Sequence, residues 1–481
     1  MEKQLKHFYL CKYFWHSSKF QVSCFYDKIN YKLKKTLCTH ILMKDFNSVP
    51  ELLNNERSTN AQMKKRRSIR YSFTDDEYNE TSYYIENGLR KVYPYYFKFR
   101  TFAKARWCGR RILDVFTSEF RGISEPVEEY VRRINEGLLT VNNKKITVDY
   151  KITHNDFMSS TVHRHELPVT AEPIHIIHKD KEKLIINKPA SIPVHPCGRY
   201  RHNTILFILA KECNFKNLLP VHRLDRLTSG ILIFGLNVDK AHTLTKQIIN
   251  HNVTKEYLCR VDGDFPNGVT TCKERIEVIH GLIAISKVSP NGKPCTTVFE
   301  KISYNGRTSL IVCRPITGRS HQIRVHLQYL GFPVVKDPLY NNTVFGPEKE
   351  RGGRIGKSDD QLIRDIFNME KYQQIKTIIN GELANLNRTQ HLSSDSIESI
   401  DINIHSVINS NWSAKTLDVT NDMLFNPCKM SFDENCSECK VFFKDPRPSE
   451  LNMCLHAWKY KGPDWSYETK LPIWTDDKWD D

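Results

Sequence analysis

Short runs of β-branched and other apolar residues alternate with Pro, Gly and Asn in the middle of the chain, from about residue 172 onward. These runs predict strands, most clearly at 184–186, 231–234, 257–261 and 310–312. Between them, apolar residues recur at helical spacing over 204–212, 239–250 and 319–330. The last of these helices is predicted to end at Gly331. Because strands and helices are mixed without strict alternation, the pattern indicates an α+β fold.

Upstream of this region, the apolar spacing predicts two short helices followed by a strand. Val115, Phe116 and Phe120 mark the first helix, and a helical repeat over 127–134 marks the second. Gly137 is expected to stop the second helix before a strand-and-turn signal at 138–142. This pattern predicts a small α/β appendage of a kind that binds RNA.

Aromatic and basic residues interleave between Tyr83 and Trp107. Such a mixture can bind single-stranded RNA, because the rings stack on bases while the cations pair with phosphates. A packed N-terminal segment with a basic rim would show the same mixture. The sequence therefore leaves both interpretations open.

Composition divides the rest of the chain. Residues 1–44 hold nine Lys and no Arg against two acidic residues, which predicts a basic, poorly ordered extension. A stretch rich in Asn, Ser, Ile and Asp predicts a disordered insert, and the Trp- and Tyr-rich tail is expected to pack on the core. The expected divisions are a basic extension (1–82), an RNA-binding-like segment (83–171), a catalytic domain (172–350), a helical extension (351–376), the insert (377–432) and the C-terminal segment (433–481).

The chain carries 71 Lys and Arg against 55 Asp and Glu, a formal charge of +16. This excess predicts a polyanionic partner, with nucleic acid ahead of an anionic membrane surface. No apolar run reaches the roughly 18–20 residues of a membrane span, so we expect no integral membrane protein. The 14 scattered cysteines are typical of reduced intracellular thiols, which favours the cytoplasm, the nucleus or the mitochondrial matrix.

The densest group of reactive side chains is His222–Gly230, which places Asp225 between Arg223 and Arg226 directly before an apolar run. Positive charge on both sides should keep the Asp225 carboxyl ionised. A surface ion pair in a turn would look the same if this motif stood alone.

Two further clusters favour a functional site. Lys255–Tyr257 opens a predicted strand, and Gly318–Leu327 opens the predicted helix at 319–330. On that helix Ile323 and Leu327 share a face expected in the core, whereas Arg324 is offset from it. Because an arginine near the core is costly without a partner, we expect Arg324 to pair with an acid.

These motifs resemble those of the RluA-type pseudouridine synthases. His222–Gly230 looks like that family's catalytic-aspartate motif, Lys255–Tyr257 like its tyrosine motif, and Gly318–Leu327 like its paired-arginine motif. Flanking segments at 187–196 and 331–340 also look like family motifs, so the resemblance covers about 172–345. Segments 161–173, 195–204 and 455–474 look closer still to a eukaryotic subgroup that includes enzymes acting on uridine 32 of tRNA.

The resemblance implies a mixed, largely antiparallel sheet flanked by helices, and a cofactor-free isomerisation of uridine in RNA. The uracil C1′–N1 bond breaks, the base rotates, and it rejoins through C5. Asp225 would either attack C1′ or remove the 2′ proton, and Arg324 would hold it ionised. Tyr257 would stack on the uracil, its hydroxyl available for removal of the C5 proton. Arg223 would fill the gap left by the flipped uridine.

Four more residues are expected to contact RNA, namely Arg226, Lys188, Arg319 and His321. Lys188 could instead cap its strand, and the histidines of these motifs are expected to be hydrogen-bonded rather than catalytic. The expected substrate is tRNA, with mRNA as a second candidate, and the expected state is a monomer without a membrane partner. The alternative is a non-catalytic RNA-binding protein that kept the fold. The presence of Asp225, Tyr257 and Arg324 together speaks against it.

Cys436 and Cys439 form a Cys-x-x-Cys pair, with Cys428, Cys454 and His456 as possible companions for zinc. One such pair with unevenly spaced companions is a weak signal, and the resemblance implies no metal. We therefore expect neither a metal nor a cofactor. A zinc nucleobase deaminase would need His-x-Glu followed by Pro-Cys-x-x-Cys, and the sequence contains neither.

Overall fold

The computed structural model describes residues 73–119, 127–281, 284–376, 378–379, 423–440 and 442–480. Most of the predicted basic extension and most of the predicted insert lie outside these residues. Within the described part of the chain, no helix has the length and apolar character needed to cross a bilayer.

Ten strands of the described chain form a central sheet. In spatial order its main path is β13 (Val269–Cys272), β16 (Thr297–Tyr304), β17 (Thr308–Pro315), β12 (Thr254–Asp262), β20 (Leu455–Lys461), β11 (Ser229–Gly235), β9 (Lys183–Lys188) and β8 (His175–Lys179). Two short strands lie off this path, β10 (Leu219–Pro220) beside β11 and β21 (Ser466–Glu468) beside β20. All neighbours are antiparallel except β11 and β20, which run parallel. The expected mixed, largely antiparallel sheet is confirmed.

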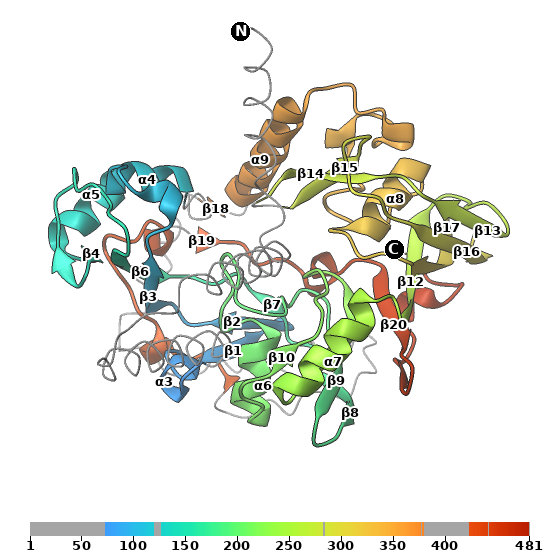
Figure 1. Cartoon of the computed structure of the whole chain (residues 1–481), viewed down its shortest axis with the longest axis horizontal. Helices are drawn as coiled ribbons and strands as arrows, with labels where there is room; N and C mark the ends of the chain where they lie inside the picture. The colour runs from blue at the N-terminus through green and yellow to red at the C-terminus, as the bar shows by residue number, and fades with distance from the viewer. Residues whose placement is uncertain are drawn as a thin grey trace, which may run out of the picture. The chain divides into compact units, whose positions relative to one another are not determined.

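The C-terminal strand β20 lies in the middle of this sheet, between β11 and β12 (Figure 1, red). The sheet is therefore not complete within 172–350, and the tail does more than pack on a finished domain. The contact with β11 is close: Gly230 has a φ of +112°, and a Cβ there would lie 2.2 Å from the backbone oxygen of Ala457. Only glycine fits this position.

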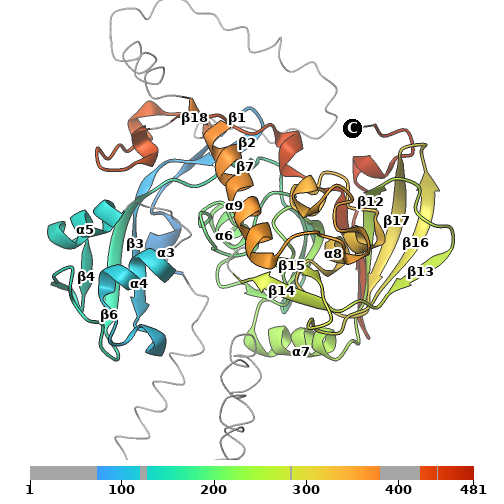
Figure 2. The same ribbon diagram turned by 90° about the horizontal axis from the view of Figure 1, so that it is seen from above.

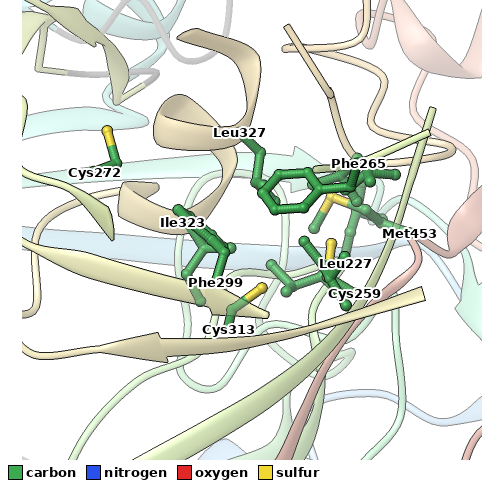
Figure 3. Close-up of a cluster of buried hydrophobic side chains, with 13 residues drawn as sticks. Leu227, Cys259, Phe265, Cys272, Phe299, Cys313, Ile323, Leu327 and Met453 are labelled. Carbon is green, nitrogen blue, oxygen red and sulfur yellow. The ribbon is translucent and has the colours of Figure 1, made fainter. Parts of the chain in front are cut away.

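Helices cover the sheet where the apolar periodicity predicted them. They are α6 (Ile205–Cys213), α7 (Val238–Ile249) and α8 (Gln322–Leu330). Gly331 ends α8 in a left-handed conformation, as expected. Ile323 and Leu327 of α8 pack into a core with Cys259, Phe299 and other buried residues (Figure 3). Figure 2 shows α8 close to β12 and β17. Helix α6 packs instead against apolar residues of β9 and β11.

The segment from 83 to 171 forms two small sheets. One is β1 (Tyr83–Glu86), β2 (Leu89–Val92) and β7 (Val169–Thr170); the other is β3 (Tyr95–Phe102), β6 (Phe157–Arg164), β4 (Leu139–Val141) and β5 (Lys144–Lys145). The two predicted helices are α4 (Ile112–Glu119) and α5 (Val127–Glu136), and their apolar faces share one core with β4 and β6. Whether this unit binds RNA stays a prediction.

Most aromatic residues in the interleaved stretch pack inward. Tyr93, Tyr95 and Trp107 are buried, whereas Tyr96 and Phe102 are exposed on the outer face of β3. This alternation is that of a strand with one covered face. Packing therefore accounts for most aromatic residues of the stretch. The exposed aromatic residues, on the outer face of β3, are the ones that remain available to RNA.

Other short elements complete the described chain. The α-helices and strands among them are α3 (Asp75–Tyr78), the hairpin of β14 (Ile276–His280) and β15 (Ile285–Val288), the longer helix α9 (Asp359–Lys376), and the pair β18 (Ile378–Ile379) and β19 (Phe442–Phe443); several 3-10 turns lie between elements. The prediction of a disordered insert over 377–432 is wrong at its C-terminal end, because residues 423–432 are structured. There Phe425 packs on the rings of Tyr84 and Tyr93, and the Tyr93 hydroxyl accepts from the backbone N–H of Asn426. The aromatic partners lie far away in sequence, so local composition does not reveal them.

Candidate active site

Asp225 lies in the loop between β10 and β11, and its side chain is 27% exposed. Its neighbours Leu224 and Leu227 are both buried, in two different core clusters. The backbone N–H of Thr228 donates to the carbonyl of Asp225 at 3.1 Å, which closes a turn. Apolar anchors on both sides thus hold the carboxylate in place at the surface.

Lys188 holds this loop from its buried side. Its ammonium group is fully buried and donates to the carbonyl oxygens of Pro189 at 2.8 Å, Ile192 at 3.0 Å and Arg226 at 3.1 Å. An ammonium group has three N–H donors, so none remains for a phosphate. The expected RNA contact of Lys188 does not fit this geometry, and the residue instead ties the end of β9 to the loop of Asp225.

Arg324, on α8, bridges two carboxylates. Its Nη1 donates to Oδ2 of Asp225 at 3.1 Å, while Nε and Nη2 donate to the two oxygens of Asp337 at 2.7 and 2.9 Å. Asp337 is buried and also accepts from the backbone N–H groups of Leu339 and Tyr340. The expected pairing of Arg324 with an acid is confirmed. The sequence motif at 331–340 contained Asp337, but nothing in it indicated this role.

The charges around Asp225 keep it ionised. Burial raises the pKa of the carboxyl, but the positive charges of His321, Arg324 and Arg223 outweigh this effect, so the pKa lies below its ordinary value. Because burial lowers the pKa of His321 below 6.5, its imidazole contributes this positive charge only in acid solution and is uncharged near neutral pH. The two arginines then supply the positive charge.

His321 stands beside Asp225 with its Nε2 3.8 Å from Oδ2. Its Nδ1 lies 2.8 Å from the hydroxyl of Tyr340, which itself accepts from the backbone N–H of Ser286. Burial raises the pKa of Tyr340, so the phenol keeps its proton and can donate it to Nδ1. In that arrangement the Nε2–H of neutral His321 faces the carboxylate.

Tyr257 reaches the same site from β12, where a break in register with β20 follows Glu256. It is half-buried, and its hydroxyl is hydrogen-bonded to that of Tyr460 on β20. Burial raises the pKa of Tyr257 to about 12, although the bond to Tyr460 lowers it. Tyr257 is therefore a protonated phenol at neutral pH. Tyr460 was not among the residues expected from the sequence, because the tail gives no sign of its place in the sheet.

Asp225, Tyr257 and Arg324 line one cavity of about 2470 Å³. The side chains expected to accompany them, Arg223, Arg226, Arg319 and His321, line it as well. Lys255, from the tyrosine motif, also lines it, and further basic residues come from segments that the sequence did not connect with the site, namely Arg199, Lys444 and Arg447. Basic side chains outnumber acidic ones on this wall, and the volume exceeds the roughly 300–1,000 Å³ of small-molecule pockets. The cavity suits a large anionic ligand.

The companions suggested for the Cys-x-x-Cys pair lie elsewhere. Cys428 is exposed, and Cys454 is buried in the core beside β20. His456 bonds Ser229 at 2.7 Å and Thr469 at 2.6 Å. These three residues therefore do not join Cys436 and Cys439 in one site.

The chain is similar to known proteins over most of its length. The RNA pseudouridylate synthase family matches residues 182–329. The chain is 43% identical over 425 residues to pseudouridylate synthase RPUSD2 of Mus musculus, covering 86% of this chain and 76% of that protein. It is 33% identical over 446 residues to the mitochondrial tRNA pseudouridine(32) synthase of Saccharomyces cerevisiae, covering 88% and 84%. With the tRNA pseudouridine(31) synthase of the same yeast it shares 30% identity over 438 residues, covering 81% and 96%.

These matches extend well beyond the catalytic sheet, since they take in more than four fifths of the chain. Asp225, Tyr257 and Arg324 all lie within the family match. The chain therefore belongs to the RluA-type RNA pseudouridine synthases, isomerases that convert uridine in RNA to pseudouridine.

Proposed function

We propose that Asp225 is the catalytic carboxylate of this synthase and that its substrate is a uridine of tRNA, first of all the one at position 32. The observation that carries the proposal is the bond from Arg324 to Asp225 in a large basic cavity. A partly exposed carboxylate held ionised by a fixed guanidinium is suited to attack C1′ or to remove the 2′ proton.

The surrounding residues support the rest of the reaction. Tyr257 offers its ring for stacking on the uracil, and its hydroxyl is near Tyr460 for proton transfer from C5. Because its pKa is about 12, Tyr257 is not a resting base, so stacking is its first role. Arg223 is exposed beside Asp225 and can occupy the space of a flipped nucleotide, while Arg226 and Arg319 offer charge to the phosphates.

The substrate assignment is supported by the relatives. Two of the three named above are tRNA pseudouridine synthases, one for position 32 and one for position 31, and the first is named as mitochondrial. Uridine 32 is therefore the first site to test and uridine 31 the second. The proposed compartments are the cytoplasm, the nucleus and the mitochondrion, and the mitochondrial relative supports the last of these. A further candidate substrate is mRNA.

The test measures tritium release from tRNA transcripts that carry 5-tritiated uridine. The wild-type chain should release tritium, and Asp225→Asn should reduce the rate by at least about 10²–10⁴-fold, the range for a positioned proton-transfer group. Asp445→Asn is the matched control, since Asp445 lines the same cavity but bonds Lys91 instead of Arg324. It should keep most of the activity.

Two outcomes would contradict the proposal. Undiminished tritium release by Asp225→Asn would show that Asp225 is not the catalytic carboxylate. If a transcript with cytidine at position 32 released as much tritium as the unaltered transcript, the target uridine would lie at another position. Position 31 would then be tested in the same way.

A further inference from the structure

Two pairs of side chains that are distant in sequence meet outside the cleft. His163 is the next-to-last residue of β6, and His165 follows the end of that strand. Cys436 and Cys439 come from the C-terminal segment, where Cys439 lies in the single 3-10 turn η7 (Glu438–Lys440). One potential ligand atom from each of the four residues lies within 4.8 Å of the other three.

The spacing suits a tetrahedral ion. Cys439 Sγ lies 3.3 Å from Nδ1 of His163 and 3.4 Å from Nε2 of His165. A tetrahedral zinc with ordinary zinc–sulfur and zinc–nitrogen bonds would separate sulfur from nitrogen by about 3.6 Å. Two thiolates and two neutral imidazoles also balance the charge of a divalent cation, and this donor set is a common one for structural zinc.

Neighbouring groups orient the donors. The Ser431 hydroxyl can donate to the carbonyl of Pro94, which only accepts, and so accepts from Nε2 of His163 at 2.8 Å. This bond fixes the tautomer, leaving the lone pair of Nδ1 directed at Cys439. The backbone N–H of Asp433 also points at Cys439 Sγ, at 3.5 Å. Outer hydrogen bonds of this kind hold the ligands of metal sites.

We propose that His163, His165, Cys436 and Cys439 bind one structural Zn²⁺. Four protein ligands leave no open coordination position, so the ion has no catalytic role. Cys439 is buried and the other three residues are half-buried, which limits exchange with solvent. The sequence-based expectation of no metal arose because the Cys-x-x-Cys pair was considered without the His-x-His pair at the end of β6, more than 270 residues earlier in the chain.

The site would tie the small β3–β6 sheet to the C-terminal segment. Directly after η7, Phe443, Lys444 and Arg447 line the active-site cavity. Glu438, in η7 itself, forms an ion pair with Arg199 of the same cavity wall. The ion would thus fix the segment that brings these basic side chains to the cleft.

The test needs no RNA substrate, so its result is independent of the proposed function. The full chain is purified under reducing conditions from zinc-containing medium, and its metal content is measured by mass spectrometry. The wild type and Cys428→Ser, which alters an exposed cysteine outside the cluster, should each carry one zinc per chain. Cys436→Ser and His165→Gln should lose it.

Cobalt substitution covers the case in which these variants do not fold. Wild-type protein, stripped of metal and titrated with Co²⁺, should show the absorption of tetrahedral cobalt–thiolate bonds, and one equivalent of Zn²⁺ should abolish it. Absence of both zinc and this absorption would overturn the proposal. So would a Cys436–Cys439 disulfide in protein alkylated at lysis, or wild-type zinc content in Cys436→Ser.

Discussion

Arg324 is the side chain on which the state of Asp225 depends. A planar guanidinium with five donors can bond two carboxylates at once, and it does so here with Asp225 and Asp337. The buried Asp337 fixes the orientation of Arg324, and Arg324 in turn fixes that of Asp225. An ammonium group at this position would keep the charge but lose this geometry.

We therefore expect Arg324→Lys to lower the turnover number by about 10–100-fold while leaving the RNA dissociation constant nearly unchanged, because positioning is lost and charge is kept. Arg319→Met is the matched control, since Arg319 is exposed on the same cavity wall and does not bond Asp225. Arg319→Met should weaken RNA binding but leave the turnover number at saturation unchanged. Single-turnover kinetics at varied enzyme concentration separates the two quantities. Parallel losses of turnover and affinity in Arg324→Lys would make Arg324 a phosphate contact.

The lowered pKa of Asp225 predicts the pH dependence. Because the positive charges outweigh burial, the carboxyl stays ionised well below neutral pH and is protonated only below its ordinary value of 3.8. Protonation of Asp225 should therefore cause no loss of the single-turnover rate as the pH falls from about 8 to about 5. The double variant Arg324→Gln/Asp337→Asn removes the charge of the buried Asp337 together with that of its partner. Asp225 then loses the charge and the hydrogen bond of Arg324, so its pKa should rise. The acid limb should then move to higher pH; identical profiles would contradict the role given to Arg324.

Among the elements, the pairing of β11 with β20 depends on Gly230. A methyl group there would meet the backbone of Ala457, which cannot move without parting the two strands. Gly230→Ala should therefore lower the free energy of unfolding by about 1–3 kcal/mol more than Gly268→Ala. Gly268 also has a positive φ, of +79°, but a Cβ there meets no atom within 4 Å, so only the conformational cost applies. Urea unfolding measures both values, and equal losses would show that the strand contact tolerates the methyl group.

The sequence pattern predicted elements better than their contacts. The helix expected at 319–330 begins at Gln322, because His321 takes a φ of 54° and Arg319 lies in the preceding turn. Periodicity does not register such a backbone turn. The order of the motifs indicated Asp225, Tyr257 and Arg324, but not Asp337, Tyr460 or the buried bonds of Lys188. Those roles depend on pairings between distant segments, which a single sequence does not specify.

For the whole molecule, the C-terminal strand is part of the catalytic sheet. A chain that ends at Leu451 lacks β20, so β11 and β12 lose their common neighbour and Tyr257 loses Tyr460. We expect this chain to show no cooperative unfolding transition by circular dichroism and no tritium release. A peptide of residues 452–480 added during refolding should restore part of both, because a free strand can pair with exposed sheet edges. Wild-type melting of the truncated chain would refute this.

The position of β20 also sets the order of events during synthesis. The ribosome makes Asp225, Tyr257 and Arg324 long before it makes residues 455–461. A nascent chain therefore has these three side chains but lacks Tyr460, and its sheet consists of two unjoined halves. Their open edges are sites where unfinished chains can pair with one another, which makes this protein a natural client for chaperones. A message with a premature stop codon near its end would consequently yield a chain without activity, although Asp225, Tyr257 and Arg324 had all been translated.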